Sequence, residues 1–308
     1  EVCYLNSKGY ADLLPEAIRI NEEPLNHPGH VGRILLNKSV HGHIDGLLQG
    51  LGVDTMFCGS KSYPLIKYGF IYNPVRSITR YIFNLLKPCM VPVSLRRYFQ
   101  KVRDVFVLDP GSYLIRSFAE SDFDEAREML GSKSGIDYLD YYQGFVNDCD
   151  RDNILRTYLG LNQHIFMIED LDSESKYGNA FNINNFYPFI DIDMLCLANK
   201  IPFSMKTRGF TGKYIIKKLA ERYFPRQFIY KKKEGFGTPM KLFFNDRNGM
   251  GRYLDMLTDR KTLERGIYNR RSVYELLDKM KSGEMYPESY ESLPWTLVNL
   301  ELWFRIFH

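Results

Sequence analysis

Metal-binding and disulfide patterns are missing from this sequence. Its 308 residues include five cysteines, an odd number, without a Cys-x-x-Cys pair or a Cys/His cluster. They lie scattered along the chain as Cys3, Cys58, Cys89, Cys149 and Cys196. This arrangement argues against a disulfide framework or a zinc site, and it favours reduced thiols in a cytoplasmic protein.

Long apolar runs are missing as well. No stretch reaches the ~18 consecutive apolar residues that a membrane span requires, and no signal peptide is visible at the start. We therefore expect a cytoplasmic protein without a membrane partner. The chain begins with Glu1 instead of Met, so we also expect it to be part of a longer protein.

A strong charge imbalance is likewise absent. The formal net charge is +4 with a pI of about 8.6, which by itself does not call for nucleic acid. Aromatic residues are abundant instead, with 22 Tyr and 21 Phe, and this abundance favours a packed core over a disordered scaffold.

One section, residues 64–103, is both basic and aromatic. Basic residues interleaved with aromatic ones are typical of single-strand nucleic-acid binding. Amphipathic helices with snorkelling Arg and Lys have the same composition, and so does a helix lying on a membrane surface. We favour the amphipathic helices, and we expect no nucleic-acid partner.

Periodicity predicts a mainly helical chain. Residues 1–36 suggest a strand or turn and then a loop, with a short helix opening at Pro15. Apolar spacing predicts helices over 31–47 and 153–170, with a polar loop at 169–176. Asp191 is expected to cap a helix over 192–200. Helical spacing predominates from residue 61 onward.

The stretch 45–59 ends a short apolar run in Gly50-x-Gly52-x-Asp54. This has the form of a buried strand followed by a glycine turn, with a carboxylate at the carboxyl end of the strand. Two interpretations remain open for Asp54. It either caps an ordinary turn or holds Mg²⁺ beside a bound phosphate.

The stretch 210–239 combines lysines with a Gly-Phe-Gly-Thr-Pro loop. Lysine supplies compact positive charge, and glycine lets backbone N–H groups approach an anion. The candidate phosphate-binding residues here are Lys213, Lys231, Lys233 and Gly235. A solvated lysine-rich surface would have the same composition.

The order of these residues is more informative than their charge. Lys-Tyr-Ile-Ile-Lys at 213–217, then Pro225, then Lys231-x-Lys233-x-Gly235-Phe-Gly-x-Pro resembles the C-terminal synthetase domain of the asparagine synthetase family. Pro-Phe-Ile-Asp at 188–191 and the closing helix with Trp295 and Trp303 are similar to further blocks of that family. The resemblance covers about residues 15–308.

This resemblance implies an α/β fold. It implies a partial parallel sheet of the adenine-nucleotide α-hydrolase type and a largely helical C-terminal portion. Residues 1–308 would form one synthetase domain, incomplete at its N-terminus, with 1–60 associated with the sheet and 61–308 mainly helical.

The resemblance also implies a chemistry. ATP would activate a small-molecule or peptide carboxylate as an acyl-adenylate, and ammonia or an amine would then attack it. Lys233 and Lys213 would be catalytic residues that meet the phosphates. Gly50, Gly52, Lys231 and Gly235 would bind the nucleotide, and Asp54 would hold Mg²⁺.

Four positions depart from the family pattern. Leu51 and Thr55 replace acidic residues, Asn184 replaces Glu, and Phe186 replaces Arg. The family's pyrophosphate loop and its glutaminase domain, the ammonia source, would both lie outside this chain. The departures leave two hypotheses open: an amide-forming ligase whose acceptor is aspartate or another carboxylate, or a non-catalytic relative that serves as a binding or assembly subunit.

Overall fold

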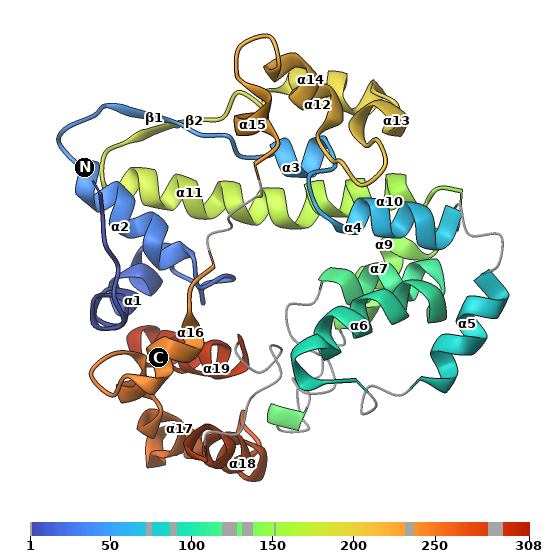
Figure 1. Cartoon of the computed structure of the whole chain (residues 1–308). Coiled ribbons are helices and arrows are strands. Elements are labelled where there is room, and N and C mark those ends of the chain that lie inside the picture. The colour runs from blue at the N-terminus through green and yellow to red at the C-terminus, as the bar shows by residue number, and fades with distance from the viewer. Residues whose placement is uncertain are drawn as a thin grey trace.

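A long central helix organises the molecule. The computed structural model describes residues 2–71, 76–86, 91–118, 128–130, 138–150, 152–231, 237–282 and 292–308. In Figure 1, helices α10 and α11 run end to end across the middle of the molecule, and the other elements group around them. A π-helical turn joins the two helices, so that the helical path is α10 (Ile154–Asn162), Gln163–Met167 and α11 (Ile168–Ala180).

The sheet is small and parallel. Strand β1 (Gly46–Leu48) pairs in register with β2 (Asn184–Phe186), with Gly46 opposite Asn184 and Leu48 opposite Phe186. The expected α/β class with a parallel sheet is therefore confirmed at this coarse level. The expected burial of β1 is wrong, because Leu48 is 73% exposed and the described chain offers only one neighbouring strand.

The first helical group lies at the lower left of Figure 1 and contains both ends of the chain. Its helices are α1 (Ser7–Asn21), α2 (His30–Val40), α16 (Met240–Asn245), α17 (Arg260–Glu264), α18 (Arg270–Lys281) and α19 (Ser292–Phe307). The indole of buried Trp295 donates to the Tyr10 hydroxyl at 2.9 Å, and Trp303 donates to the Glu22 carbonyl at 2.9 Å. The tryptophan-bearing helix α19 thus closes the group against α1.

Helix α1 overturns the expected strand or turn in 1–36 and the expected helix start at Pro15. The helix begins at Ser7, capped by the side chain of Asn6, and Pro15 lies inside it. A proline inside a helix leaves the carbonyl four residues earlier without its usual N–H partner. Here that carbonyl, on Ala11, accepts the Tyr253 hydroxyl at 2.9 Å, so a distant contact compensates for the break.

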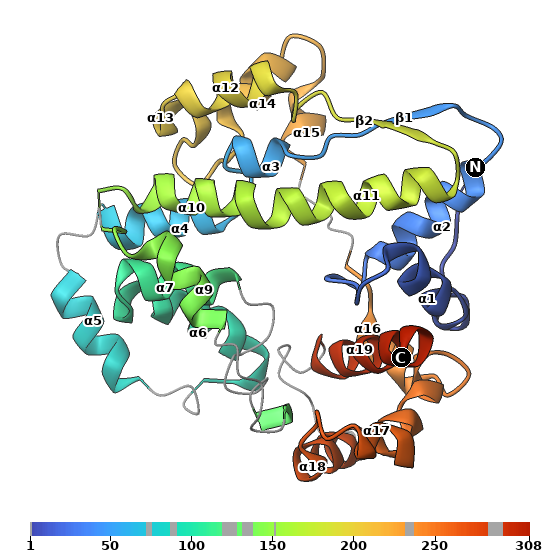
Figure 2. The same cartoon turned by 180° about the vertical axis from the view of Figure 1, so that it is seen from behind.

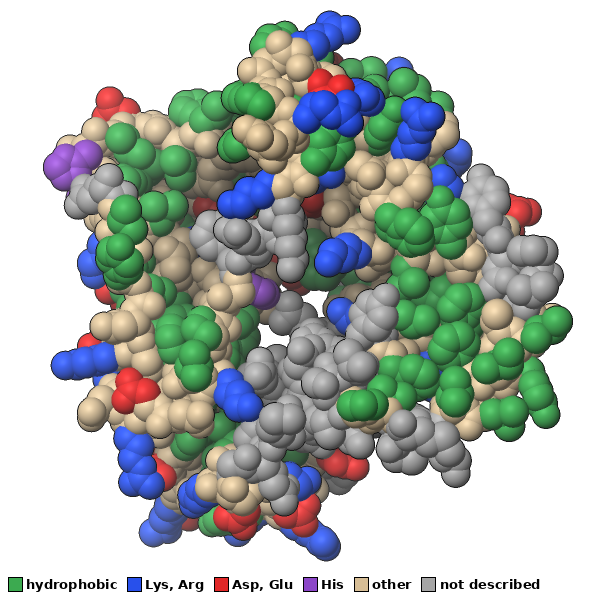
Figure 3. All heavy atoms as spheres, in the orientation of Figure 1, with side chains coloured by type: hydrophobic (Ala, Val, Ile, Leu, Met, Phe, Trp, Pro, Cys, Tyr) green, Lys and Arg blue, Asp and Glu red, His purple; other side chains and the backbone are tan. Residues whose placement is uncertain are grey.

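The second group packs beneath α10 on the right of Figure 1. It comprises α4 (Ser62–Ile66), the π-helical turn Lys67–Ile71, α5 (Arg76–Leu85), α6 (Val93–Val107), α7 (Pro110–Phe118) and α9 (Tyr138–Val146). Its buried core includes Tyr63, Phe70 and Leu114. Exposed apolar side chains of α5 dominate the right-hand face in Figure 3, where the basic and aromatic section lies.

The third group caps the other side of α10 and α11, as the reverse view in Figure 2 shows. It comprises α3 (Val53–Met56), α12 (Ile192–Lys200), α13 (Phe203–Lys206), α14 (Tyr214–Ala220) and α15 (Arg226–Ile229). The Asp191 side chain accepts from the Asp193 N–H at 3.0 Å, so the expected N-cap of α12 is confirmed. Among the described residues, no helix is both long and apolar enough to cross a membrane.

The expected polar loop at 169–176 is wrong, because these residues are helical in α11. Their polar side chains have partners on other elements. Buried Glu174 accepts from Arg33 at 3.1 Å and from Gln49 at 2.9 Å, and Lys176 donates to the Asn21 carbonyl at 2.9 Å. Hydrogen bonds to other elements thus stabilise a helix in a segment whose composition is typical of a loop.

A buried histidine predicts how stability depends on pH. His30 is 2% exposed, and its Nδ1 lies 2.5 Å from the Tyr177 hydroxyl. Burial, reinforced by the Arg33 and His27 side chains, lowers its pKa from 6.5 to about 3. The unfolded chain therefore binds a proton that the folded chain does not, and stability should fall as pH drops from 6.5 toward 3.

We expect this single group to remove about 1.4 kcal/mol of unfolding free energy for each pH unit below 6.5. The measurement is urea unfolding across that window, in the wild type and in His30→Asn, whose pH slope should be shallower by up to one proton. His43→Asn, at an exposed histidine, is the control and should keep the wild-type slope. An unchanged slope in His30→Asn would contradict this origin of the pH dependence.

Candidate functional site

The site is built on the turn that follows β1. Gly52 has a φ of 86°, a left-handed conformation that glycine adopts without strain, and α3 begins at the next residue. Asp54 therefore lies in the first turn of this short helix. Its carboxylate folds back over Gly59, where the Cβ of any other residue would overlap Asp54 Oδ1. Glycine at position 59 thus makes the space in which the carboxylate sits.

A second segment docks onto this turn from far along the chain. Arg208 and Thr211 exchange backbone hydrogen bonds at 3.0 Å, which closes a tight loop before α14. Gly212 then lies directly against the Cys58 carbonyl, where a Cβ would not fit. The Lys213 N–H donates to the Phe57 carbonyl at 2.9 Å. Backbone contacts thus fix the position of residue 213 whatever its side chain.

The two segments bring Asp54 and Lys213 together. Lys213 Nζ lies 2.8 Å from Asp54 Oδ1, and the two side chains are 24% and 43% exposed. Lys213 has a φ of 54°, a conformation that is uncommon for a lysine. The structure thus holds a carboxylate and an ammonium at a partly open surface, where an incoming ligand can reach both.

A third charged group stands nearby. Lys217 lies on α14, four residues after the N-cap residue Lys213. Burial and the neighbouring Lys213 ammonium lower the pKa of Lys217, and Asp54 partly opposes them. No role for Lys217 was predicted from the sequence, although it lies only four residues after Lys213, the residue that caps the start of α14.

A polar network supports the turn from behind. Gln49, at the end of β1, donates to buried Glu174 at 2.9 Å and to Asn185 Oδ1 at 3.1 Å. Glu174 is also ion-paired with Arg33 at 3.1 Å. These contacts anchor the carboxyl ends of both strands to α11 and α2. Sequence reasoning missed this network because its members lie on four separate elements.

The described residues contain no group of three or more His, Cys, Asp or Glu side chains that could hold a metal. They do fit the looser requirement of nucleotide-bound Mg²⁺, which takes one or two carboxylates and leaves the other positions to water and phosphate. Asp54 supplies one hard oxygen ligand, and the space over Gly59 holds it in place. A single carboxylate thus suits an Mg²⁺ ion that is already bound to the phosphates of a nucleotide.

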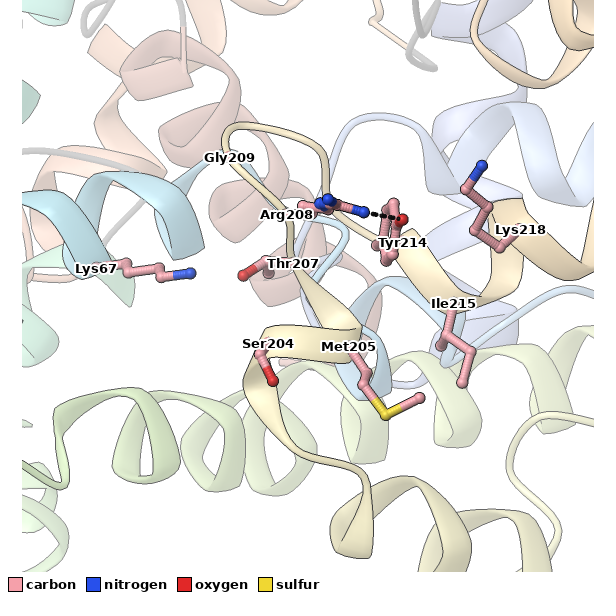
Figure 4. A pocket seen from close by; sticks show the side chains of 9 residues that line it. All are labelled: Lys67, Ser204, Met205, Thr207, Arg208, Gly209, Tyr214, Ile215 and Lys218. Carbon is pink, nitrogen blue, oxygen red and sulfur yellow. Dashed lines mark hydrogen bonds between the residues drawn. The ribbon is translucent and has the colours of Figure 1, made fainter.

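The 203–218 segment also lines a pocket (Figure 4). Its cavity volume is about 510 Å³. Lys67 reaches in from the π-helical turn after α4, and the other walls come from α13, the following loop and α14. Arg208 donates to the Tyr214 hydroxyl at 2.7 Å along one wall.

A sequence model of asparagine synthase matches residues 1–305, nearly the entire chain. The chain belongs to the asparagine synthase family. Members of this family are carbon–nitrogen ligases, and the match agrees with the resemblance seen in the motifs at 188–191 and 213–239.

The matching relatives are distant and longer. The chain is 24% identical to a putative glutamine-hydrolyzing asparagine synthetase of Mycobacterium bovis, over 97% of this chain and 45% of that protein. The Mycobacterium tuberculosis protein of the same name gives the same values. A glutamine-hydrolyzing asparagine synthetase of Bacillus subtilis is also 24% identical, over 77% of this chain and 37% of that protein. The chain thus spans less than half the length of these relatives, and no solved structure matches it.

The structure gathers some of the residues expected at the site. Asp54 and Lys213 are ion-paired, and Gly52 makes the turn before them. Gly50 is exposed, with open space where a Cβ would point. Lys231 is exposed at the end of the segment that follows α15. The remaining two, Lys233 and Gly235, lie outside the described residues.

Two of the four departures flank Asp54, and the other two lie on β2 beside the start of β1. Leu51 and Thr55 are half-buried on either side of Asp54. Asn184 and Phe186 belong to β2, where the Phe186 ring covers Gly46 on the opposite strand, 2.7 Å from where a Cβ would stand. Leu51 and Thr55 thus put uncharged groups next to Asp54 where the family pattern has acidic ones.

Proposed function

We propose that this chain is the synthetase portion of an ATP-dependent amide-forming ligase. On this proposal, residues 1–308 form one domain of the adenine-nucleotide α-hydrolase type, incomplete at the N-terminus. Support comes from the family match and, above all, from the Asp54–Lys213 ion pair at 2.8 Å, formed where the turn after β1 meets the loop before α14. A carboxylate and a lysine at one open edge can receive a metal-bound phosphate chain.

In the proposed reaction, a carboxylate oxygen of the acceptor attacks the α-phosphorus of ATP, and pyrophosphate leaves. Negative charge builds on the departing oxygens, where fixed cations stabilise it in a site with little water. Lys213 would meet these oxygens from α14, and Lys217 adds positive charge one turn behind it. Lys233 and Lys231 would act on the same phosphates, with Gly50, Gly52 and Gly235 letting backbone N–H groups approach.

Asp54 would hold Mg²⁺, which when bound neutralises phosphate charge and orients the oxygens. Without substrate, the Lys213 ammonium is ion-paired with the Asp54 carboxylate, so that neither partly buried charge lacks an opposite charge. The pair therefore keeps both side chains in the orientation that the nucleotide needs. Binding would exchange one ion pair for a carboxylate–metal and a lysine–phosphate contact.

Ammonia or an amine then attacks the acyl-adenylate and releases AMP. The donor would be a glutaminase domain or another ammonia source outside this chain. The acceptor would be a small-molecule or peptide carboxylate, either aspartate or another. The uncharged residues Leu51, Thr55, Asn184 and Phe186, which replace charged ones of the family pattern, favour another. ATP and reduced thiols are both found in the cytosol, where we propose that the protein acts.

The first test is ATP–pyrophosphate exchange with the full-length protein, Mg²⁺ and a panel of carboxylates that includes aspartate. We expect exchange that depends on one class of carboxylate, because only adenylation makes the loss of pyrophosphate reversible. No exchange with any carboxylate, in a folded protein, would contradict the proposal and favour the non-catalytic binding or assembly subunit.

A further inference from the structure

Helix α5 turns an apolar stripe to solvent. The residues of the stripe recur every three or four positions, which places them on one side of a helix. Their exposed fractions lie between 38% and 66%, at Ile78, Tyr81, Ile82, Leu85 and Leu86. The Leu86 N–H donates to the Ile82 carbonyl at 3.2 Å, so that Leu86 continues the helical path. Single exposed apolar side chains are common on proteins, whereas a contiguous stripe of five marks an interaction surface.

Contacts on the inner side of α5 fix this orientation. The Phe83 ring stacks on Phe106 of α6, with the ring centroids 5.0 Å apart and an angle of 4° between the planes, and lies 5.9 Å from the Phe99 ring. Arg103 of α6 donates to the Phe83 carbonyl at 3.4 Å. Because Phe83 packs on α6, the 100° step per residue turns most of the stripe away from the protein. Helix α5 lies at the outer edge of the molecule in both Figure 1 and Figure 2.

The polar residues of α5 are kept apart from the stripe. Ser77, Arg80 and Asn84 are exposed, and the helical spacing places all three on one side, between the inner side and the stripe. Between residues 77 and 86 the stripe itself contains no charged residue. Helix α5 is therefore amphipathic on the surface that faces away from the protein.

The same part of the chain supplies positive charge. Residues 76–103, which include α5 and most of α6, contain seven lysines and arginines and no aspartate or glutamate. The next acidic residue, Asp104, is only 6% exposed and accepts from Gln100 at 2.8 Å. The apolar stripe thus belongs to a segment that brings cations to the surface and no carboxylate of its own, which suits an anionic partner.

We propose that α5 lies on an anionic lipid surface and inserts its apolar stripe into it. A helix of this kind places its apolar side chains at the boundary between head groups and acyl chains, while neighbouring cations meet the negative head groups. Tyr81 suits this boundary, because its ring is apolar and its hydroxyl is polar. Helix α5 (Arg76–Leu85) is about 15 Å long, so it lies along the surface and is too short to cross a bilayer.

Two other occupants fit this surface less well. A second copy of the chain would bring two positively charged segments together, and such like-charge contacts weaken binding. A protein partner is usually held by Trp, Tyr and Arg anchors, whereas four of the five stripe residues are Ile or Leu. The expectation of no membrane partner rested on the missing spanning segment, which a helix that lies on a surface does not need. Lipid binding at α5 is also independent of the adenylation chemistry proposed above.

The experiment is co-sedimentation of the full-length protein with vesicles, without ATP. One set of vesicles is phosphatidylcholine alone, and the other contains about one third phosphatidylglycerol. We expect binding to the anionic vesicles that weakens as salt is raised, and binding at least about tenfold weaker to phosphatidylcholine alone. Arg80→Gln should weaken binding to the anionic vesicles about fivefold, the usual effect of one surface cation. Arg247→Gln, at an exposed arginine of the first helical group, is its control and should bind within about twofold of the wild type.

A double variant tests the apolar stripe. Ile82→Gln with Leu85→Gln should weaken binding to the anionic vesicles about tenfold or more, because two inserted apolar side chains are lost. Both positions are exposed, so the fold should persist. The matched control is Leu197→Gln with Leu242→Gln, at leucines that are 54% and 68% exposed on α12 and α16. It should bind within about twofold of the wild type.

Insertion itself is read from fluorescence. Tyr81→Trp places an indole on the stripe, and brominated lipid should quench it in anionic vesicles, whereas the indole of Leu197→Trp should not be quenched. No binding to anionic vesicles, equal weakening by the two double variants, or binding without quenching at position 81 would each overturn the proposal. Self-association of the chain or binding of an acidic protein, without vesicle binding and lost in the Ile82/Leu85 double variant, would assign α5 to that partner instead.

Discussion

Asp54→Asn should lower ATP–pyrophosphate exchange at least about a hundredfold, because the amide keeps the shape of the side chain and removes the charge that holds a divalent cation. The loss should appear mainly as a raised Mg²⁺ requirement and a lowered kcat. The measurement is exchange rate against Mg²⁺ concentration in the full-length protein, with the carboxylate that supports exchange in the wild type.

Loss of fold is not expected to explain this result. The Asp54 side chain is 43% exposed, and ion pairs at such positions contribute only about 0–1 kcal/mol to stability. Asp45→Asn is the matched control, since Asp45 is an exposed carboxylate at the other end of β1. It should retain wild-type exchange. Exchange in Asp54→Asn within about threefold of the wild type, at every Mg²⁺ concentration, would remove Asp54 from the metal site.

The chemical part of the site could be predicted from short segments of sequence. Asp54 stands in a Gly-x-Gly-x-Asp turn, and Lys213 opens a Lys-Tyr-Ile-Ile-Lys run, so each residue carries a local pattern. Their pairing was not predictable from either pattern. It depends on Gly212 fitting against the Cys58 carbonyl and on the hydrogen bond from the Lys213 N–H to Phe57.

The predicted elements failed where tertiary contacts outweighed local preference. Pro15 is a helix breaker in sequence, yet the Tyr253 hydroxyl satisfies the carbonyl that it leaves open. Residues 169–176 have the composition of a loop, yet Arg33 and Gln49 hold Glu174 on a helix. In both cases the stabilising partner lies far away in the sequence, where periodicity carries no information.

The fold class was predictable for a different reason. The resemblance of the motifs at 188–191 and 213–239 to the asparagine synthetase family implied an α/β chain, and the parallel pair of β1 and β2 agrees. The exposure of Leu48 was not predictable, because it depends on how many strands lie beside β1. An apolar run predicts that a strand can be buried, but it does not predict how many strands pair with it in this chain.

Lys213→Met should lower the exchange rate by about a hundredfold to a thousandfold, the usual effect of removing one fixed charge from a developing oxyanion. Methionine keeps an unbranched side chain of similar length without the ammonium. Residue 213 is held by its own N–H and by Gly212, so the α14 backbone should stay in place. The measurement is kcat and KM for ATP in the exchange assay, together with urea unfolding.

The pattern of loss distinguishes chemistry from structure. If Lys213 meets the leaving phosphate, its removal should lower kcat more than it raises KM for ATP, because the contact strengthens as charge develops. Lys213→Arg should recover only part of the rate, since the guanidinium is larger and places its charge further out. The matched control is Lys200→Met, an exposed lysine at the end of α12, which should exchange like the wild type. If Lys213→Met exchanges as fast as Lys200→Met, then Lys213 serves only to hold Asp54, and the cation that stabilises the departing pyrophosphate must be another lysine of the 210–239 stretch.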